Sequence, residues 1–172
     1  MRKGHADEFD AFCVSSYPRV VAALSHIVGD VPLAEDLAQE ALIRAYQRWG
    51  RVSQLRSPLG WTVHVGANLA RSALRRRLVQ RRARQREPVD AAVQHDGGVT
   101  LRIVLNDVLS TLSPIQREVV VLRYFVGLDT IEVGELLGVE PNAVRQRTHR
   151  ALAAMRQVLP HEDVAEELNR GT

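Results

Sequence analysis

The segment 140–158, EPNAVRQRTHRALAAMRQV, concentrates positive charge. It contains five arginine or histidine residues and one acid, Glu140, and no further acid follows before Glu162. A helix that only needs a soluble face usually mixes acids with bases, because opposite charges three or four positions apart stabilise it. The composition therefore favours a helix that lies against a polyanion; a solvated basic face is the alternative.

Two faces of this segment differ when it is drawn as a helix. Small and apolar residues recur at three- and four-residue spacing, and we expect them to pack on the preceding helices: Val144, Thr148, Ala151 and Met155. A second face at similar spacing carries polar side chains: Asn142, Arg145, Gln146 and His149.

The polar face suits DNA. Arg145 can hydrogen-bond a guanine edge and Gln146 an adenine edge, whereas Arg147 and Arg150 are better suited to phosphates. The preceding residues, TIEVGELL and then GVEP, predict a short helix and a tight turn with glycine, which completes a helix-turn-helix pattern. We therefore predict that 140–158 is a recognition helix whose first half meets base edges.

A denser arginine cluster occupies 71–86, RSALRRRLVQRRARQR, which has no acid. Its members are Arg71, Arg75, Arg76, Arg77, Arg81, Arg82, Arg84 and Arg86. Such charge density destabilises an isolated helix and favours a polyanionic partner, although a solvated, partly frayed helix end is the alternative. Upstream, Trp61, Val65 and Asn68 share one helix face, and together with the downstream cations they can hold an unstacked base and its backbone. Trp61 and Val65 can equally be core residues.

An acidic face precedes this cluster. Its side chains are Glu35, Asp36, Gln39 and Glu40. Carboxylates repel DNA, so this face suits a basic protein partner better, with a solvated surface as the default alternative.

The bulk composition limits the protein class. The chain has 172 residues, 45% of them hydrophobic, with a net charge of +3, and few aromatic or strand-rich runs, so we expect an all-α fold. Cys13 is the single cysteine and forms no intrachain disulfide. The N-terminus turns acidic before any apolar run and no uninterrupted apolar span occurs, so we expect a soluble, intracellular protein without membrane insertion. The scattered histidines lack metal-ligand spacing and no glycine-rich phosphate loop occurs, so we expect no metal, no cofactor, no small-molecule substrate and no catalytic residue.

Local signals place the helices. Gly29 and Pro32 separate one or two N-terminal helices from a helix with an apolar stripe: Leu37, Ala41, Ala45 and Trp49. A loop, 50–57, leads to Ser57 and Pro58, which start a long helix reaching about residue 77 or beyond. After a helix at 101–109, Ser113 and Gln116 form a capping box, and Gly127 closes the next helix in a left-handed conformation. The predicted buried stripe of that helix is Ile115, Val119, Leu122 and Val126.

These segments resemble a known family. AEDLAQEALIRAYQRW and WTVHVGANLARSALRRR resemble region 2 of extracytoplasmic-function (ECF) sigma factors, the smallest members of the sigma-70 family. LSPIQREVVVLRYFVGLDTIEVGELLGVEPNAVRQRTHRALAAMR resembles their region 4, and DEFDAFCVSSYPRVVAALSHIVGD resembles the start of SigE-like members. The resemblance covers nearly everything but the central linker and the last dozen residues. Gly66 departs from it, because the family usually has alanine there.

The resemblance implies a role for each surface. The acidic face matches the surface that docks on the β′ clamp helices of core RNA polymerase: Glu35, Asp36, Gln39 and Glu40. The loop 50–57 and the helix after it match the pocket and cations that hold the melted −10 strand: Trp61, Val65, Asn68, Arg71, Arg75 and Arg76. The polar face of 140–158 matches the −35 reader: Asn142, Arg145, Gln146, Arg147, His149 and Arg150. Apolar parts of the C-terminal half would pack on the β flap, and a separate anti-sigma factor is the expected inhibitor.

We therefore expect two small helical domains joined by a flexible linker. The expected boundaries are 1–86 for region 2, 87–100 for the linker, 101–160 for region 4 and 161–172 for a C-terminal tail. The alternative is a helix-turn-helix regulator that binds duplex DNA without core polymerase, which would leave the acidic face and the arginine-rich helix without a role.

Overall fold

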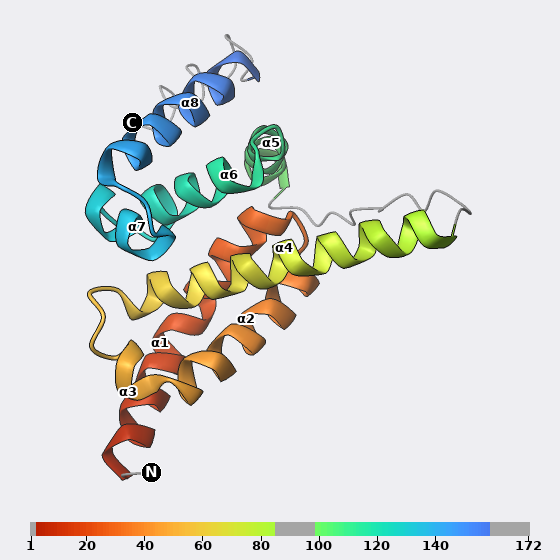
Figure 1. Ribbon diagram of the computed structural model, residues 1–172. Helices are drawn as coiled ribbons and strands as arrows, with labels where there is room; N and C mark the ends of the chain where they lie inside the picture. Colours follow the sequence, from red (N-terminus) through yellow and green to blue (C-terminus); the bar gives the residue numbers. More distant parts are fainter. Residues whose placement is uncertain (1–2, 85–98, 159–172) are drawn as a thin grey trace.

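A computed structural model of the chain describes residues 3–84 and 99–158 (Figure 1). Every regular element in these two ranges is a helix, which confirms the all-α class. In chain order the elements are α1 Lys3–Val28, α2 Val31–Gln47, α3 Trp49–Val52, α4 Pro58–Arg84, α5 Val99–Ser110, α6 Pro114–Val120, the π-helix η1 Val121–Phe125, α7 Thr130–Leu137 and α8 Pro141–Val158. The predicted linker lies outside the described residues except for its last two positions, which begin α5, and the predicted tail lies outside them too.

The N-terminal half is built on α1, which is one helix and continues through Pro18. Asp30 then caps α2, because its carboxylate accepts a hydrogen bond from the backbone N–H of Leu33 at 2.8 Å. α2 ends at Gln47, so Trp49, which the sequence placed on the same helical stripe, lies instead in the short α3, where it is still buried. The predicted loop 50–57 therefore begins with the rest of a helical turn.

Close packing sets the position of α4 on α1. Ser57 starts α4 as predicted, since its hydroxyl accepts a hydrogen bond from the backbone N–H of Gly60 at 3.0 Å. Further along, a Cβ atom added at Gly66 would lie 2.6 Å from the Cδ1 atom of Leu24, a side chain that is fully buried. Glycine at this position thus allows α4 to approach α1 more closely than alanine would.

α1 is also the described helix that is long and apolar enough to cross a membrane, with a hydropathy of 1.3 within His5–Val28. The sequence predicted no segment apolar enough to span a membrane, and by length and composition α1 passes that test. Phe9, Val20 and Leu24 are nevertheless buried in the hydrophobic core of the protein. A core helix accounts for the same composition, so the finding by itself assigns no membrane contact.

The C-terminal half starts from local caps. The capping box on α6 is confirmed: the hydroxyl of Ser113 accepts from the backbone N–H of Gln116, and the Gln116 side chain accepts from the backbone N–H of Ser113. Gly127 has φ of 88°, which confirms the left-handed closure. Three residues of the predicted buried stripe are buried, but the prediction for Ile115 is wrong. Its side chain is 37% exposed, because it lies in the first turn of α6, beyond the core.

The two halves share one hydrophobic core, an arrangement that the sequence left open. A single cluster joins Val20 of α1 and Val63 of α4 to Val121 of η1, Val133 of α7 and Val144 of α8. Figure 1 shows α6 and α7 lying against α1 and α4. Polar contacts cross the same boundary: the Arg117 guanidinium donates to the backbone carbonyl of Ile27 at 2.9 Å. The described chain is therefore closed, with its second half packed on its first.

Candidate nucleic-acid and protein interfaces

The polar face of α8, here called the duplex surface, is open to solvent. It consists of the exposed side chains Asn142, Arg145, Gln146, His149 and Arg150, with Arg147 half-buried beside them. On the opposite side Val144, Thr148 and Ala151 are buried, as the helical spacing predicted, and Met155 is partly buried. Four residues of the duplex surface line a shallow depression: Arg145, Gln146, His149 and Arg150.

α7 and a tight turn position this surface. A Cβ atom at Gly134 would lie 2.7 Å from the backbone oxygen of Val139, so glycine lets the turn fold back on α7. Asp129 caps α7 by accepting from the backbone N–H groups of Ile131 and Glu132. The hydrogen bond from Glu132 is the largest cause that lowers the pKa of the Asp129 carboxyl, and the charge of Arg56 acts in the same direction. The result is a helix-turn-helix with its second helix facing outward.

The acidic face lies on the outer side of α2. All four of its side chains are exposed: Glu35, Asp36, Gln39 and Glu40. The opposite side of the helix is buried in the core through Ala34, Leu37, Ala38 and Ala41. Glu40 accepts a hydrogen bond from Arg44 at 2.9 Å, and an exposed pair of this kind contributes only about 0.3–0.5 kcal/mol to stability. Carboxylates on this face are therefore available to a partner.

The face of α4 that carries the predicted single-strand residues, here called the strand surface, is less open. Trp61, Val65 and Arg71 are half-buried, and Asn68, Arg75 and Arg76 are exposed. Trp61 packs at the edge of a cluster around Trp49, so the core interpretation of Trp61 holds in part. The remaining cluster members are Arg77, Arg81, Arg82, Arg84 and Arg86; no description covers their side chains.

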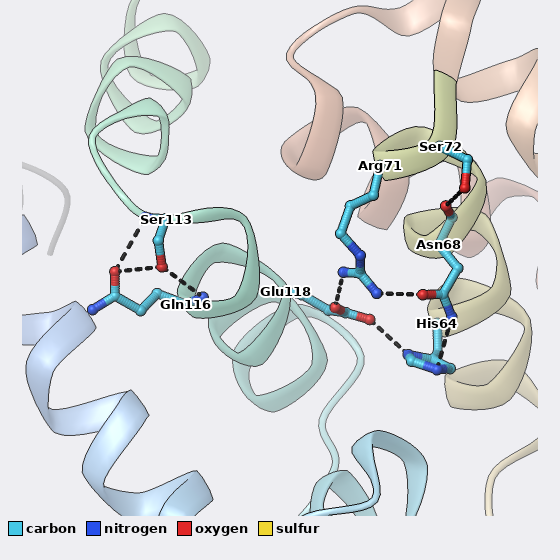
Figure 2. A network of polar contacts seen from close by, with 7 residues as sticks. All are labelled: His64, Asn68, Arg71, Ser72, Ser113, Gln116 and Glu118. Carbon is cyan, nitrogen blue, oxygen red and sulfur yellow. Dashed lines mark hydrogen bonds and ion pairs between the residues drawn. The ribbon is translucent and has the colours of Figure 1, made fainter. Parts of the chain in front are cut away.

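A buried carboxylate occupies the middle of the strand surface (Figure 2). Glu118 of α6 is 0% exposed. One of its oxygens bonds the Nδ1 atom of His64 at 2.7 Å, and the other accepts from the Arg71 guanidinium. Asn68 joins the network, because its amide oxygen accepts from Arg71 and its amide nitrogen lies 2.9 Å from Nε2 of His64. Two of the predicted single-strand residues are thus bonded to each other, and Arg71 is also bonded to the other half of the chain.

A cavity of about 290 Å³ lies beside this network. The N-terminal half contributes Leu55, Arg56, Ser57, Trp61 and His64 to its lining. The wall from α7 consists of Glu132, Glu135 and Leu136. The structure therefore brings the end of the predicted loop and Trp61 together around one cavity, and the C-terminal half contributes two carboxylates to its lining.

Sequence analysis missed Glu118 and His64. Glu118 follows Arg117 in the run QREVVVLRYF, where a single acid directly precedes three valines that the structure buries. A lone carboxylate that directly precedes an apolar run is a signal for a buried, paired charge. Its partners, 54 and 47 positions away, carry no such signal, because no local spacing relates α4 to α6.

Two family models match the chain, in the predicted order. Sigma-70 region 2 matches residues 13–82, and sigma-70 region 4 matches residues 102–155. Among curated proteins, the RNA polymerase sigma factor CarQ of Myxococcus xanthus is 34% identical over 161 residues, which cover 92% of each chain. The ECF RNA polymerase sigma factor SigW of Bacillus subtilis is 30% identical, again over 92% of each chain.

A solved structure supports the fold. The sigma factor RpoE of Bartonella quintana, crystallised with the anti-sigma factor NepR, has a TM-score of 0.77 at 19% identity, covering 91% of this chain and 99% of that one. Together with the two matched regions and the full-length relatives, this confirms the resemblance that the motifs indicated. The chain belongs to the sigma-70 family, and within it to the ECF RNA polymerase sigma factors.

Proposed function

We propose that this chain binds core RNA polymerase, recognises the −35 and −10 elements of a promoter, and promotes DNA melting for transcription initiation. The observation that carries the proposal is the match to both sigma regions, in order, on a chain whose α8 presents a free basic face. In this scheme residues 1–86 form the region 2 domain and 101–160 the region 4 domain, with 87–100 as linker and 161–172 as tail.

Region 4 would contact the −35 duplex through α8. The first half of a recognition helix meets base edges, which suits Arg145 and Gln146, while Arg147 and Arg150 would contact phosphate. Asn142 and His149 complete the exposed surface. Its shallow, arginine-lined shape and the lack of acids between 140 and 162 support this assignment.

Region 2 would hold the melted −10 strand on α4. A flipped base needs a pocket with an aromatic wall, and Trp61 and Ser57 line the cavity beside the strand surface. Val65 and Asn68 lie along the same helix, and Arg71, Arg75 and Arg76 would follow the phosphates. The acidic face of Glu35, Asp36, Gln39 and Glu40 would dock on the β′ clamp helices, which requires basic groups on the partner.

Other partners follow from the family. The region 4 domain would also pack on the β flap, and an anti-sigma factor would be the inhibitor; RpoE of Bartonella quintana was solved with one. The chain itself would perform no chemistry, since the polymerase carries the catalytic centre, and we propose that it acts in the cytoplasm. No cofactor, small-molecule substrate or membrane insertion enters this scheme.

Run-off transcription tests the proposal. Core polymerase is supplied with a library of randomised promoters, with and without this protein, and the transcripts are sequenced. We expect defined start sites only when the protein is present, with two preferred blocks upstream. Start-site selection that is the same without the protein would exclude the function. The alternative, a helix-turn-helix regulator independent of core polymerase, predicts duplex binding alone and leaves the region 2 match unexplained.

A further inference from the structure

A buried carboxylate, Glu118, joins the two halves of the chain where α6 meets α4. Glu118 is a fully buried carboxylate on α6, yet both side chains that bond its oxygens, His64 and Arg71, come from the other half of the chain. A buried carboxylate is stable only when a cation and hydrogen-bond donors accompany it. Glu118 is therefore satisfied only while the two halves are packed together.

The groups that bond Glu118 are suited to another anion. The planar fork of arginine binds carboxylate and phosphate with the same donor geometry. Arg71 directs this fork at Glu118 and at the amide oxygen of Asn68, and the amide nitrogen of Asn68 is directed at His64 (Figure 2). One nitrogen of Arg71 thus donates to a carboxylate from region 4, and a second donates to Asn68.

Two acidic side chains of α7 also lie near the strand surface. Glu132 and Glu135 of α7 line the cavity that also contains Trp61 and Ser57. Carboxylates that line the same cavity as Trp61 repel a DNA backbone that approaches it. The duplex surface of α8, in contrast, stays exposed in the same arrangement. Closure therefore occupies Arg71 and places carboxylates beside Trp61, while Asn68, Arg75, Arg76 and the duplex surface stay exposed.

Opening does not have to leave an unpaired charge behind. When the halves separate, Glu118 and Arg71 both return to water, and the desolvation cost of the buried pair is recovered. Opening also exposes the apolar core that the two halves share, so the closed state is favoured, and only a partner that binds the open state more tightly shifts the populations. A DNA phosphate that binds Arg71 would replace the Glu118 carboxylate, so the arginine keeps an anionic partner in the open state.

We propose that Glu118 is an autoinhibitory residue, which competes with the phosphates of single-stranded DNA for Arg71 and keeps the strand surface closed until the halves separate. The proposal rests on the proposed function, because it takes α4 as the single-strand site. In the closed state the protein contacts duplex DNA through α8 but does not hold a melted strand.

The test measures binding of a fluorescent single-stranded dT20 oligonucleotide to the full-length protein, by anisotropy and without polymerase. Glu118→Gln keeps the size of the side chain and removes its charge, so Arg71 loses its anion in the closed state and the open state gains population. We expect dT20 to bind about 5- to 150-fold more tightly, the usual range of coupling between linked equilibria. Small-angle scattering should show a larger radius of gyration for this variant.

Asp107→Asn is the matched control. Asp107 is an exposed residue of α5 in the same half, so its substitution removes the same charge without touching α4. It should leave dT20 affinity near that of the wild type, and a random 30-base-pair duplex should bind all three proteins alike. An equal gain in both variants would mean that net charge alone sets the affinity and would overturn the proposal.

Arg117→Gln gives a second, independent opening. Arg117 donates to the carbonyl of Ile27 across the boundary and to the carbonyl of Leu109 within its own half. If Glu118→Gln does not fold, as judged by circular dichroism, Arg117→Gln carries the test and should also tighten dT20 binding. Folded variants with wild-type dT20 affinity would overturn autoinhibition. Run-off transcription separates the two proposals. Variants that transcribe normally but bind dT20 as the wild type does contradict only this inference, whereas a wild-type protein that directs no start-site selection contradicts the proposed function.

Discussion

Two arginine-bearing helices of this protein, α8 and α4, differ in what their cations contact. On α8, Arg145 and Arg150 are exposed and line an open depression. On α4, Arg71 is half-buried and bonded to Glu118 from the other half of the chain. Both helices have the composition of a nucleic-acid surface, and both bury the side opposite to their arginines.

The difference shows that a basic composition does not by itself decide whether the cations of a helix are free or already paired. α8 ends the described chain and packs through one side only, against α5, α6 and α7. α4 lies between α1 and α2 on one side and α6 and α7 on the other. The helix at the centre of the fold is the one with a half-buried cation, Arg71, that is paired internally, because burying an arginine requires an anion beside it.

The acidic face of α2 gives the largest expected effect, because in the proposed function both DNA surfaces act only once the protein is docked on the polymerase. Changing Asp36 and Glu40 together to alanine should abolish co-purification with core polymerase, since the partner's basic groups lose their anions. Circular dichroism should show unchanged helicity, because both side chains are exposed. Association that survives the double change would remove the assignment of this face.

On the duplex surface, Arg145→Ala should weaken promoter binding by about 1–3 kcal/mol and relax the preference at one −35 position, as expected for a bidentate base contact. The measurement is holoenzyme binding to a set of −35 variants. Arg156→Ala, near the end of the same helix, is the comparison variant and should leave that preference intact. Equal losses on all sequences would reassign Arg145 to a phosphate.

On the strand surface, Asn68→Ala should weaken strand opening by about 0.5–1.5 kcal/mol, the usual net contribution of a hydrogen bond, and affect duplex binding less. A promoter with a pre-melted bubble should rescue the variant, and permanganate footprinting would follow the opening. A defect that is as large on the bubble as on the duplex would instead place the role of Asn68 after melting.

The smallest expected effect concerns the packing of α4 on α1, the helix that supports the strand surface. Gly66→Ala would place a Cβ atom 2.6 Å from the buried Leu24. Overpacking typically costs about 1–3 kcal/mol, and the better helix propensity of alanine offsets about 1 kcal/mol of it. We therefore expect a net loss of about 1 kcal/mol in unfolding free energy by urea titration, with the −35 preference unchanged. A stabilised variant would show that α4 and α1 are less tightly packed than described.

Local patterns predicted much of this fold. Ser113 and Gln116 form the expected capping box, Ser57 starts α4, and the buried side of α8 is the one that the spacing of Val144 and Thr148 indicated. These features depend on residues within a few positions of one another. The errors lie at helix ends, where Trp49 begins a new helix and Ile115 extends beyond the core, because helix periodicity does not tell where a neighbouring helix stops.

The sequence by itself determined the helical class, the order of the two sigma regions and the residue types on each candidate surface, because helical spacing fixes which side chains share a face. Only the tertiary structure decided that Glu118 meets Arg71, 47 positions away, and that α7 faces the cavity beside Trp61. These contacts follow from the apolar core that joins the two halves. Such a core is built from many weak contacts between distant segments, and no local pattern specifies which helices it brings together.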